Sequence, residues 1–257
     1  MTRPQNIASA DLDIRKYVIR LAAEVGDVLG ERLAGLYVHG SLATGSFFRN
    51  ASDIDVLVLV TEALPRTVRD RLDQTLRELN RSRPTKGEIE VTVVQRVHAK
   101  NYEHPMPVEL QFNSKPSAVP AQLLHAKERS VRLVGDEPQH AIGPVPWYAF
   151  MDAVVSDFDD KASRIETKPV SVILNACRTL HDATVPSIRI VSKIQAAECA
   201  LLVVPEHLQA LIRNALDVYR EDASRSFDPG QIRELRAFVE EHASSTFQKV
   251  RDTGDEE

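Results

Sequence analysis

The sequence of 257 residues predicts an α/β unit followed by an all-α unit. The first observation behind this prediction is that strand-like and helix-like patterns alternate through the first half of the chain. The second is that only helical periodicity occurs from Trp147 onward. We therefore expect a small mixed sheet with packed helices over residues 1–158 and a bundle of helices over residues 159–257. The boundary is placed inside or just after the helix that begins at Trp147.

The elements of the first half follow from the spacing of apolar residues. Apolar side chains recur at helical spacing over residues 10–33 and again from Val68 to Leu79, which predicts two amphipathic helices. Short apolar segments rich in β-branched residues predict strands over residues 36–39, 53–60, 88–95 and 108–112.

The elements of the second half are predicted as helices by apolar stripes. One stripe runs from Val172 to Leu180, and another runs from Leu208 to Tyr219. The last helix is expected to begin at Asp228 and Pro229, because aspartate is a favoured N-cap and proline is favoured at the first helical position.

Charge and composition exclude several classes of function. Asp and Glu total 37 against 32 Lys and Arg, so the net charge is −5, whereas proteins that bind DNA usually carry the opposite sign. No run of about 18 apolar residues predicts a membrane span, and the N-terminus lacks the apolar core of a signal peptide. We expect a cytoplasmic monomer that binds a small cationic molecule rather than nucleic acid or a membrane.

The segment from Gly40 to Asp55 carries the candidate chemistry. A strand is expected to lead into Gly40 and Ser41, where glycine lets a phosphate approach the backbone and the serine hydroxyl adds a donor. Asp53 and Asp55 follow at the start of the next strand, and alternation directs both carboxylates to the same side. Two close carboxylates repel each other unless a cation lies between them. Mg²⁺ suits this arrangement, because it binds one or two carboxylates together with substrate phosphates.

The strand expected over residues 88–95 adds a third acid. Glu90 lies on the face opposite Ile89, Val91 and Val93, in a sheet small enough for that face to reach the same metal. A carboxylate there is able to bind metal or to remove a proton from an attacking hydroxyl.

These motifs resemble those of the DNA polymerase β-like nucleotidyltransferases, in which Gly-Ser precedes an Asp-x-Asp at the head of a strand and a later acidic strand residue. The ordered segments HGSLATGSFFRNASDIDVLVLV, EVTVV and ELQF further resemble the aminoglycoside adenylyltransferases that act at the 3″ or 9 hydroxyl of streptomycin and spectinomycin. The likeness is strongest over residues 36–112 and continues through the helical half. It implies a polymerase β-like nucleotidyltransferase domain followed by an α-helical domain that binds substrate and nucleotide.

The resemblance also implies a role for each matching residue. Asp53 and Asp55 match the aspartates that bind two Mg²⁺ ions, and Glu90 matches the catalytic base beside the same metals. The residues that match nucleotide-binding positions are Gly40, Ser41, Ser52, Arg178, Lys193 and Tyr219. Tyr219 also continues an apolar helical stripe, so packing in the core is an equally good interpretation of that residue.

The reaction that the resemblance implies is transfer of AMP from ATP to a hydroxyl of an aminoglycoside-type antibiotic, which confers resistance. Family members that modify streptomycin carry a Trp shortly after ELQF and an Asp before the first helix of the second domain. In this chain ELQF is followed by residues 113–115 (NSK), without a Trp. The region that matches the Asp, residues 164–168, contains Glu166 as its only acid. Both differences count against streptomycin. Two alternatives stay open: the same chemistry on a protein hydroxyl or another metabolite, and a catalytically idle binding module.

The acidic run of residues 157–160 has two interpretations. It is either a solvated helix face or a negatively charged wall that attracts a polycationic antibiotic.

Overall fold

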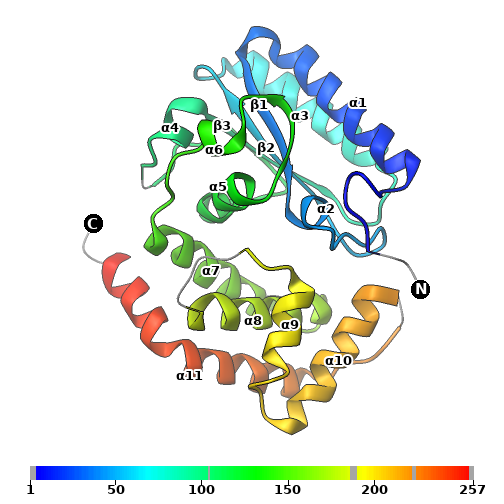
Figure 1. Cartoon of the computed structure of the whole chain (residues 1–257), viewed down its shortest axis with the longest axis vertical. Coiled ribbons are helices and arrows are strands. Elements are labelled where there is room, and N and C mark those ends of the chain that lie inside the picture. The colour runs from blue at the N-terminus through cyan, green and yellow to red at the C-terminus, as the bar shows by residue number, and fades with distance from the viewer. Residues whose placement is uncertain (1–3, 104, 186–189, 222–223, 255–257) are drawn as a thin grey trace. The chain divides into compact units, whose positions relative to one another are not determined.

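The computed structural model describes residues 4–103, 105–185, 190–221 and 224–254. These residues form two compact units, one over Pro4–Pro146 and one that begins at Trp147 (Figure 1). The division therefore falls at Trp147, earlier than the boundary after residue 158 that the sequence predicts. The reason is that the helix beginning at Trp147 packs on the helices that follow it. Each unit is described by itself below.

The first unit is built on a five-stranded mixed sheet. The strands follow the order β4-β3-β2-β1-β5, with β2 and β3 parallel and the other neighbouring pairs antiparallel. Their bounds are Leu33–His39 (β1), Ile54–Val60 (β2), Ile89–Gln95 (β3), Leu110–Phe112 (β4) and Val131–Gly135 (β5). The helices are Leu12–Leu29 (α1), Gly40–Thr44 (α2), Arg66–Arg81 (α3), Arg96–Lys100 (α4), Val119–Glu128 (α5) and Pro138–Ala141 (α6), with 3₁₀ turns at Gly30–Arg32 and Pro116–Ala118.

The two faces of this sheet have different coverings. Helices α1 and α3 lie side by side on one face (Figure 1), where their apolar stripes pack on alternate residues of β1, β2 and β3. Helix α5 contacts β1 and β2. The strand residues buried under α1 and α3 include Val56 and Val91, so Asp55 and Glu90, one position earlier, project from the opposite face.

The first helix and one edge strand of this unit differ from the sequence prediction, and helices α4, α5 and α6 are absent from it. The first helix ends at Leu29 rather than near residue 33, because Gly30 adopts φ +56° at its C-cap and Leu33 already belongs to β1. Strand β5 is missing from the prediction. It is a short edge strand whose residues are half-buried or exposed, so it lacks the apolar pattern that marks the inner strands.

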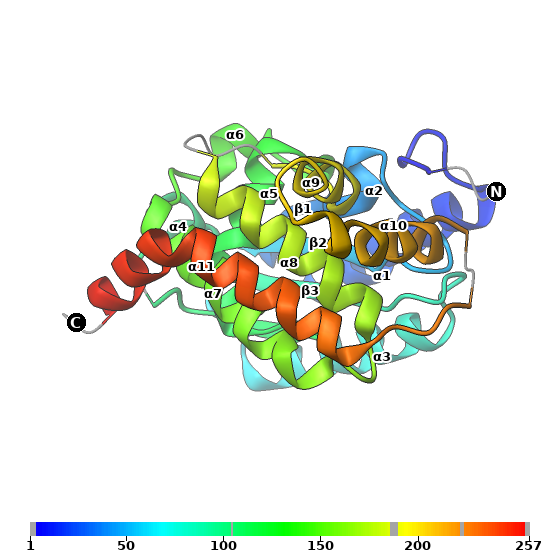
Figure 2. The ribbon, with the colours of Figure 1, turned by 90° about the horizontal axis from the view of Figure 1, so that it is seen from below.

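The second unit consists of helices, as the sequence predicts, and none of its described residues lies in a strand. Helix α8 contacts α7, α9, α10 and α11, and Figure 2 shows α7, α8 and α11 alongside one another. The bounds are Trp147–Lys161 (α7), Pro169–Thr184 (α8), Lys193–Ala200 (α9), Glu206–Glu221 (α10) and Pro229–Gly254 (α11), with a 3₁₀ turn at Ala162–Arg164.

The predicted start of the last helix is confirmed. The carboxylate of Asp228 accepts a hydrogen bond from the N–H of Gly230 at 2.9 Å, and α11 begins at Pro229. In the described part of the chain, no helix is both long enough and apolar enough to cross a bilayer.

Candidate active site

Three neighbouring strands place His39, Asp55 and Glu90 in one row across the sheet. His39 pairs with Asp55 in the antiparallel register of β1 and β2, and Asp55 pairs with Glu90 in the parallel register of β2 and β3. Directly paired residues project from the same face. The register therefore brings two of the three predicted acids side by side, on the face opposite α1 and α3.

The chain turns at Gly40, directly beside Asp55. Gly40 follows β1 with φ +64°, and a Cβ at this position would lie 1.9 Å from Oδ2 of Asp55 and 2.8 Å from its Cγ. Only glycine leaves room for this carboxylate. The Gly-Ser motif and the Asp-x-Asp motif therefore meet in space, although eleven residues separate Ser41 from Asp53 in the sequence.

Asp53 lies just before β2 and is fixed by the backbone of the neighbouring strand. Its Oδ1 accepts a hydrogen bond from the N–H of Glu88 at 2.8 Å, and the N–H of Ile54 donates to the carbonyl oxygen of Glu88 at 2.9 Å. The chain passes close by at Gly87, where a Cβ would lie 2.1 Å from the carbonyl oxygen of Ser52. The start of β2 is thus held firmly against the start of β3.

The residues of this face fit a magnesium site that a nucleotide completes. Among the described residues, no three His, Cys, Asp or Glu side chains gather closely enough to hold a metal by themselves. Mg²⁺ does not need such a group, because it binds one or two carboxylates and takes its other ligands from water and substrate phosphates. The space that Gly40 leaves around the Asp55 carboxylate, and the adjacent Glu90, meet that requirement.

The two predicted phosphate-binding serines have different environments. Ser41 is half-exposed in the first turn of α2, beside Gly40. Ser52 is buried, and its Oγ accepts a hydrogen bond from the N–H of Phe48 at 3.0 Å. Ser52 therefore stabilises the loop that leads into β2, and its contact with a triphosphate stays a prediction.

A buried polar group beside Glu90 was not assigned a role from the sequence. Thr92, two residues further along the same face of β3, donates a hydrogen bond to Oε1 of Gln122 at 2.7 Å, and Nε2 of Gln122 donates to Oγ of Ser114 at 2.7 Å. The first bond ties α5 to β3, the strand that carries Glu90, and the second ties α5 to the segment after β4. The threonine in the pattern EVTVV was the available signal, but its partners come from distant parts of the chain.

His39 is a buried neutral side chain in the same row. It is 3% exposed, its ring nitrogens have no hydrogen-bond partner among the described residues, and its ring meets that of His125 edge-on at 6.4 Å between centroids. Burial lowers the pKa of His39 from 6.5 to about 4, because the protonated ring would lose its hydration. His39 is therefore uncharged at neutral pH.

This lowered pKa predicts a dependence of stability on pH. Between pH 6.5 and 4 the unfolded chain binds a proton at His39 that the folded chain does not, so the free energy of unfolding decreases as pH falls through this window. The contribution is about 3 kcal/mol at most. Urea denaturation followed by far-UV circular dichroism at pH 7.0, 5.5 and 4.5 measures it. The variant His39→Leu should show a shallower decrease than wild type, and the exposed His140→Leu serves as the control. Equal slopes for His39→Leu and wild type would contradict the expectation.

The helical unit gathers cationic side chains around one carboxylate. Asp157 in α7 forms an ion pair with Lys161 one helical turn later, and it lies 3.5 Å from Nη2 of Arg178 in α8. It also accepts a hydrogen bond from Nδ2 of Asn175 at 2.7 Å. Asp157 therefore forms ion pairs within its own unit, whereas Asp159 and Asp160 are exposed, as the interpretation of a solvated helix face predicts. Lys161 was missed from the sequence, although its i,i+4 spacing from Asp157 was a usable signal.

The pKa values of this ion pair follow from burial and from the neighbouring charges. Burial raises the pKa of Asp157, but Lys161 and Arg178 lower it by more, so the carboxyl group titrates below its ordinary range. Burial lowers the pKa of Lys161, and Asp157 only partly offsets this effect.

Lys193 and Tyr219, two further predicted nucleotide-binding residues, lie next to each other. Lys193 is the first residue of α9, whose start is fixed by a capping box between Ser192 and Gln195. Its Nζ lies 6.0 Å from the centre of the Tyr219 ring. Tyr219 is 7% exposed in the apolar stripe of α10. Tyr219 therefore packs in the core and also makes a cation–π contact with Lys193.

Comparison with protein families accounts for both units. Residues 20–129 match the model of the nucleotidyltransferase domain, and residues 140–245 match the model of the C-terminal domain of aminoglycoside adenylyltransferase. This chain belongs to the aminoglycoside adenylyltransferase family. It is an enzyme of the nucleotidyltransferase class, and the predicted fold class, a polymerase β-like nucleotidyltransferase domain followed by a helical domain, is confirmed.

Individual relatives support the same assignment. Spectinomycin 9-adenylyltransferase of Staphylococcus aureus is 26% identical over 233 residues, which cover 84% of this chain and 88% of the relative. Aminoglycoside (3″) (9) adenylyltransferase of Klebsiella pneumoniae is 27% identical over 234 residues, which cover 79% and 86% of the two chains. The crystal structure of a spectinomycin adenyltransferase from Enterococcus faecialis with ATP and spectinomycin matches with a TM-score of 0.78 at 18% identity. The match covers 90% of this chain and 99% of that one.

Proposed function

We propose that this adenylyltransferase transfers AMP from ATP to a hydroxyl of spectinomycin in a reaction that requires Mg²⁺, and that it thereby confers resistance in the cytoplasm. The observation that carries the proposal is the register that places Asp55 beside Glu90, with Gly40 leaving room at the Asp55 carboxylate. The names of the relatives in Staphylococcus aureus and Campylobacter jejuni support spectinomycin as the acceptor.

In this proposal the acidic residues of the first unit have two roles, metal binding and proton transfer. Asp53 and Asp55, with Glu90 beside them, would hold two Mg²⁺ ions, which would supply positive charge that stabilises the α-phosphate during transfer. Glu90 accepts the proton of the acceptor hydroxyl. The deprotonated oxygen attacks the α-phosphorus of ATP, the bond from that phosphorus to the bridging oxygen breaks, and pyrophosphate leaves.

The remaining predicted residues bind the nucleotide. Ser41 at the Gly40 turn donates a hydrogen bond to the triphosphate, and Ser52 supports the same loop. Arg178 and Lys193 neutralise the β- and γ-phosphates, since cations stabilise charge that builds up on the departing pyrophosphate. Tyr219 orients Lys193 through the contact of 6.0 Å with its ring.

The choice between spectinomycin and streptomycin rests on the segment after β4. Asn113 there adopts φ +52°, and its side-chain amide donates a hydrogen bond to the carbonyl oxygen of Ile89 at 3.0 Å. Residues 113–115 are Asn, Ser and Lys, so the tryptophan expected of streptomycin-modifying members is absent from this segment. We therefore expect spectinomycin to be the better substrate.

The test is a panel of acceptors. Purified protein is incubated with ATP, Mg²⁺ and spectinomycin, streptomycin or further aminoglycosides in turn, and pyrophosphate release and the mass of each drug are measured. The proposal expects spectinomycin to gain the mass of one AMP residue, with no gain when Mg²⁺ is chelated. Transfer to streptomycin instead would overturn the proposed acceptor. Transfer only to a protein hydroxyl or another metabolite, or no transfer at all, would overturn the proposed function.

A further inference from the structure

The side chains of Asp157, Lys161, Arg178 and Lys193 together carry one negative and three positive charges. Three cationic side chains contribute to the electrostatic environment of a single carboxylate. The side chain of Lys161 is only 16% exposed and that of Arg178 27%. Partly buried cations are unfavourable without compensating anions. This surplus therefore calls for a negatively charged ligand.

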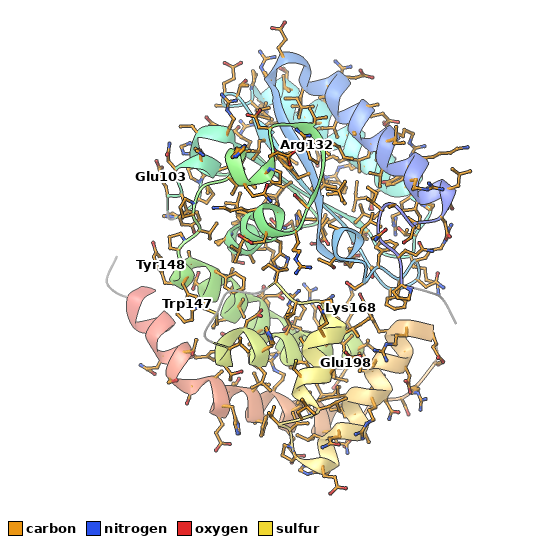
Figure 3. All side chains as sticks on the ribbon, viewed as in Figure 1. Glu103, Arg132, Trp147, Tyr148, Lys168 and Glu198 are labelled. Atoms are coloured by element: carbon orange, nitrogen blue, oxygen red, sulfur yellow. The ribbon has the colours of Figure 1, made fainter. Side chains whose placement is uncertain are left out.

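A surface ion pair of the same unit provides a contrast. Arg220 of α10 donates to Glu198 of α9 at 2.7 Å, and the side chains of the two residues are 38% and 56% exposed. Glu198 is labelled in Figure 3. Such exposed pairs contribute little and need no ligand. The cations around Asp157 are more deeply buried, with side chains 16% and 27% exposed.

A second observation at the same place is the buried side chain of Asn175. It is 1% exposed, and its Nδ2 donates to Asp157. Its Oδ1 has no hydrogen-bond partner among the described residues. Buried polar atoms are nearly always paired, so an exception marks an incomplete hydrogen-bond network that a ligand or an ordered water completes. The incomplete network and the surplus charge occur around the same carboxylate.

We propose that Lys161 is a third phosphate-binding cation of this enzyme, which binds the β- and γ-phosphates of ATP together with Arg178 and Lys193. The inference rests on the proposed function for the identity of the anion. Asp157 is the positioning residue, because it holds Lys161 on α7 and Arg178 on α8 toward each other before the nucleotide arrives. Asn175 in turn fixes Asp157.

Isothermal titration calorimetry of the full chain tests this proposal with three probes: Mg²⁺–ATP, AMP and inorganic tripolyphosphate. Lys161→Met should weaken the binding of ATP and of tripolyphosphate roughly 10- to 100-fold, the loss expected for one charge-assisted hydrogen bond. The binding of AMP should change less than about twofold, since AMP lacks the β- and γ-phosphates. Lys161→Arg should restore most of the affinity. Lys16→Met, which removes an exposed lysine from α1, is the matched control and should bind all three probes like wild type.

The outcomes separate this inference from the proposed function. If Lys161→Met binds tripolyphosphate and ATP as wild type does, or loses affinity for AMP by the same factor, the role of Lys161 is overturned while adenylyl transfer stands. If wild type binds tripolyphosphate through Lys161 but transfers AMP to no acceptor, the anion site is supported and the proposed function fails.

Discussion

Glu90→Gln is expected to reduce the turnover of adenylyl transfer about 10²- to 10⁴-fold, the usual contribution of a general base. Glutamine keeps the size of the side chain and its place in the row beside Asp55. It has no basic carboxylate, so the acceptor hydroxyl keeps its proton and attacks poorly. The affinity for Mg²⁺–ATP should stay within about threefold of wild type. Initial rates of pyrophosphate release give the turnover, and calorimetry gives the affinity for ATP.

Glu88→Gln is the matched control for this experiment. Glu88 precedes β3, its side chain is exposed, and its interaction with Asp53 uses the backbone N–H, which the substitution leaves intact. The control should therefore keep nearly wild-type turnover. If Glu90→Gln keeps full activity, or if Glu88→Gln loses as much, Glu90 is not the base.

Gly40→Ala is expected to reduce kcat/KM about 100-fold or more, because misplacing a reacting or metal-binding group by about 1 Å has effects of this size. The added Cβ would lie 1.9 Å from Oδ2 of Asp55, so the carboxylate has to move. The Mg²⁺ concentration that gives half-maximal activity should rise, because Asp55 no longer lies beside the Gly40 turn. Initial rates measured across a Mg²⁺ titration report both quantities.

Gly45→Ala separates the displacement of Asp55 from backbone strain. Gly45 also adopts a positive φ, +78°, but a Cβ there would meet nothing closer than Cβ of Asn6 at 3.9 Å. Both variants carry a backbone penalty of about 1–2 kcal/mol in stability. Only Gly40→Ala should lose activity strongly at a temperature where both are folded. Equal activities of the two variants would show that the close contact of Gly40 with Asp55 has no role in function.

The candidate site was predictable from the sequence where its residues lie close together in the chain. Gly40, Ser41, Asp53 and Asp55 fall within one short segment, and the residue types alone indicate phosphate and metal binding. Glu90 was predictable because period-two alternation assigned it to one face of its strand. The strand β5 was not predictable in this way, since a half-exposed edge strand carries little apolar pattern.

Features that depend on pairs of distant residues needed the structure. Asp157 looked like part of a solvated acidic run, yet it contacts Asn175 and Arg178 on a different helix. Lys161 belonged to no recognised motif, although its i,i+4 spacing from Asp157 was a local signal. The unit boundary at Trp147 likewise depends on which helices α7 packs against, and hydrophobic periodicity does not contain that information.

The sequence by itself determined the class of chemistry and the order of the elements, because local spacing controls which side chains share a strand face or a helix stripe. The tertiary structure decided which charges share an environment. It placed Asp55 against Gly40 and beside Glu90. It also brought Arg178 of α8 to the Asp157–Lys161 pair of α7, with Lys193 of α9 near enough to lower the pKa of Asp157. The physical reason is that electrostatic interactions depend on distance and burial in space, which residues far apart in the chain acquire only when it folds.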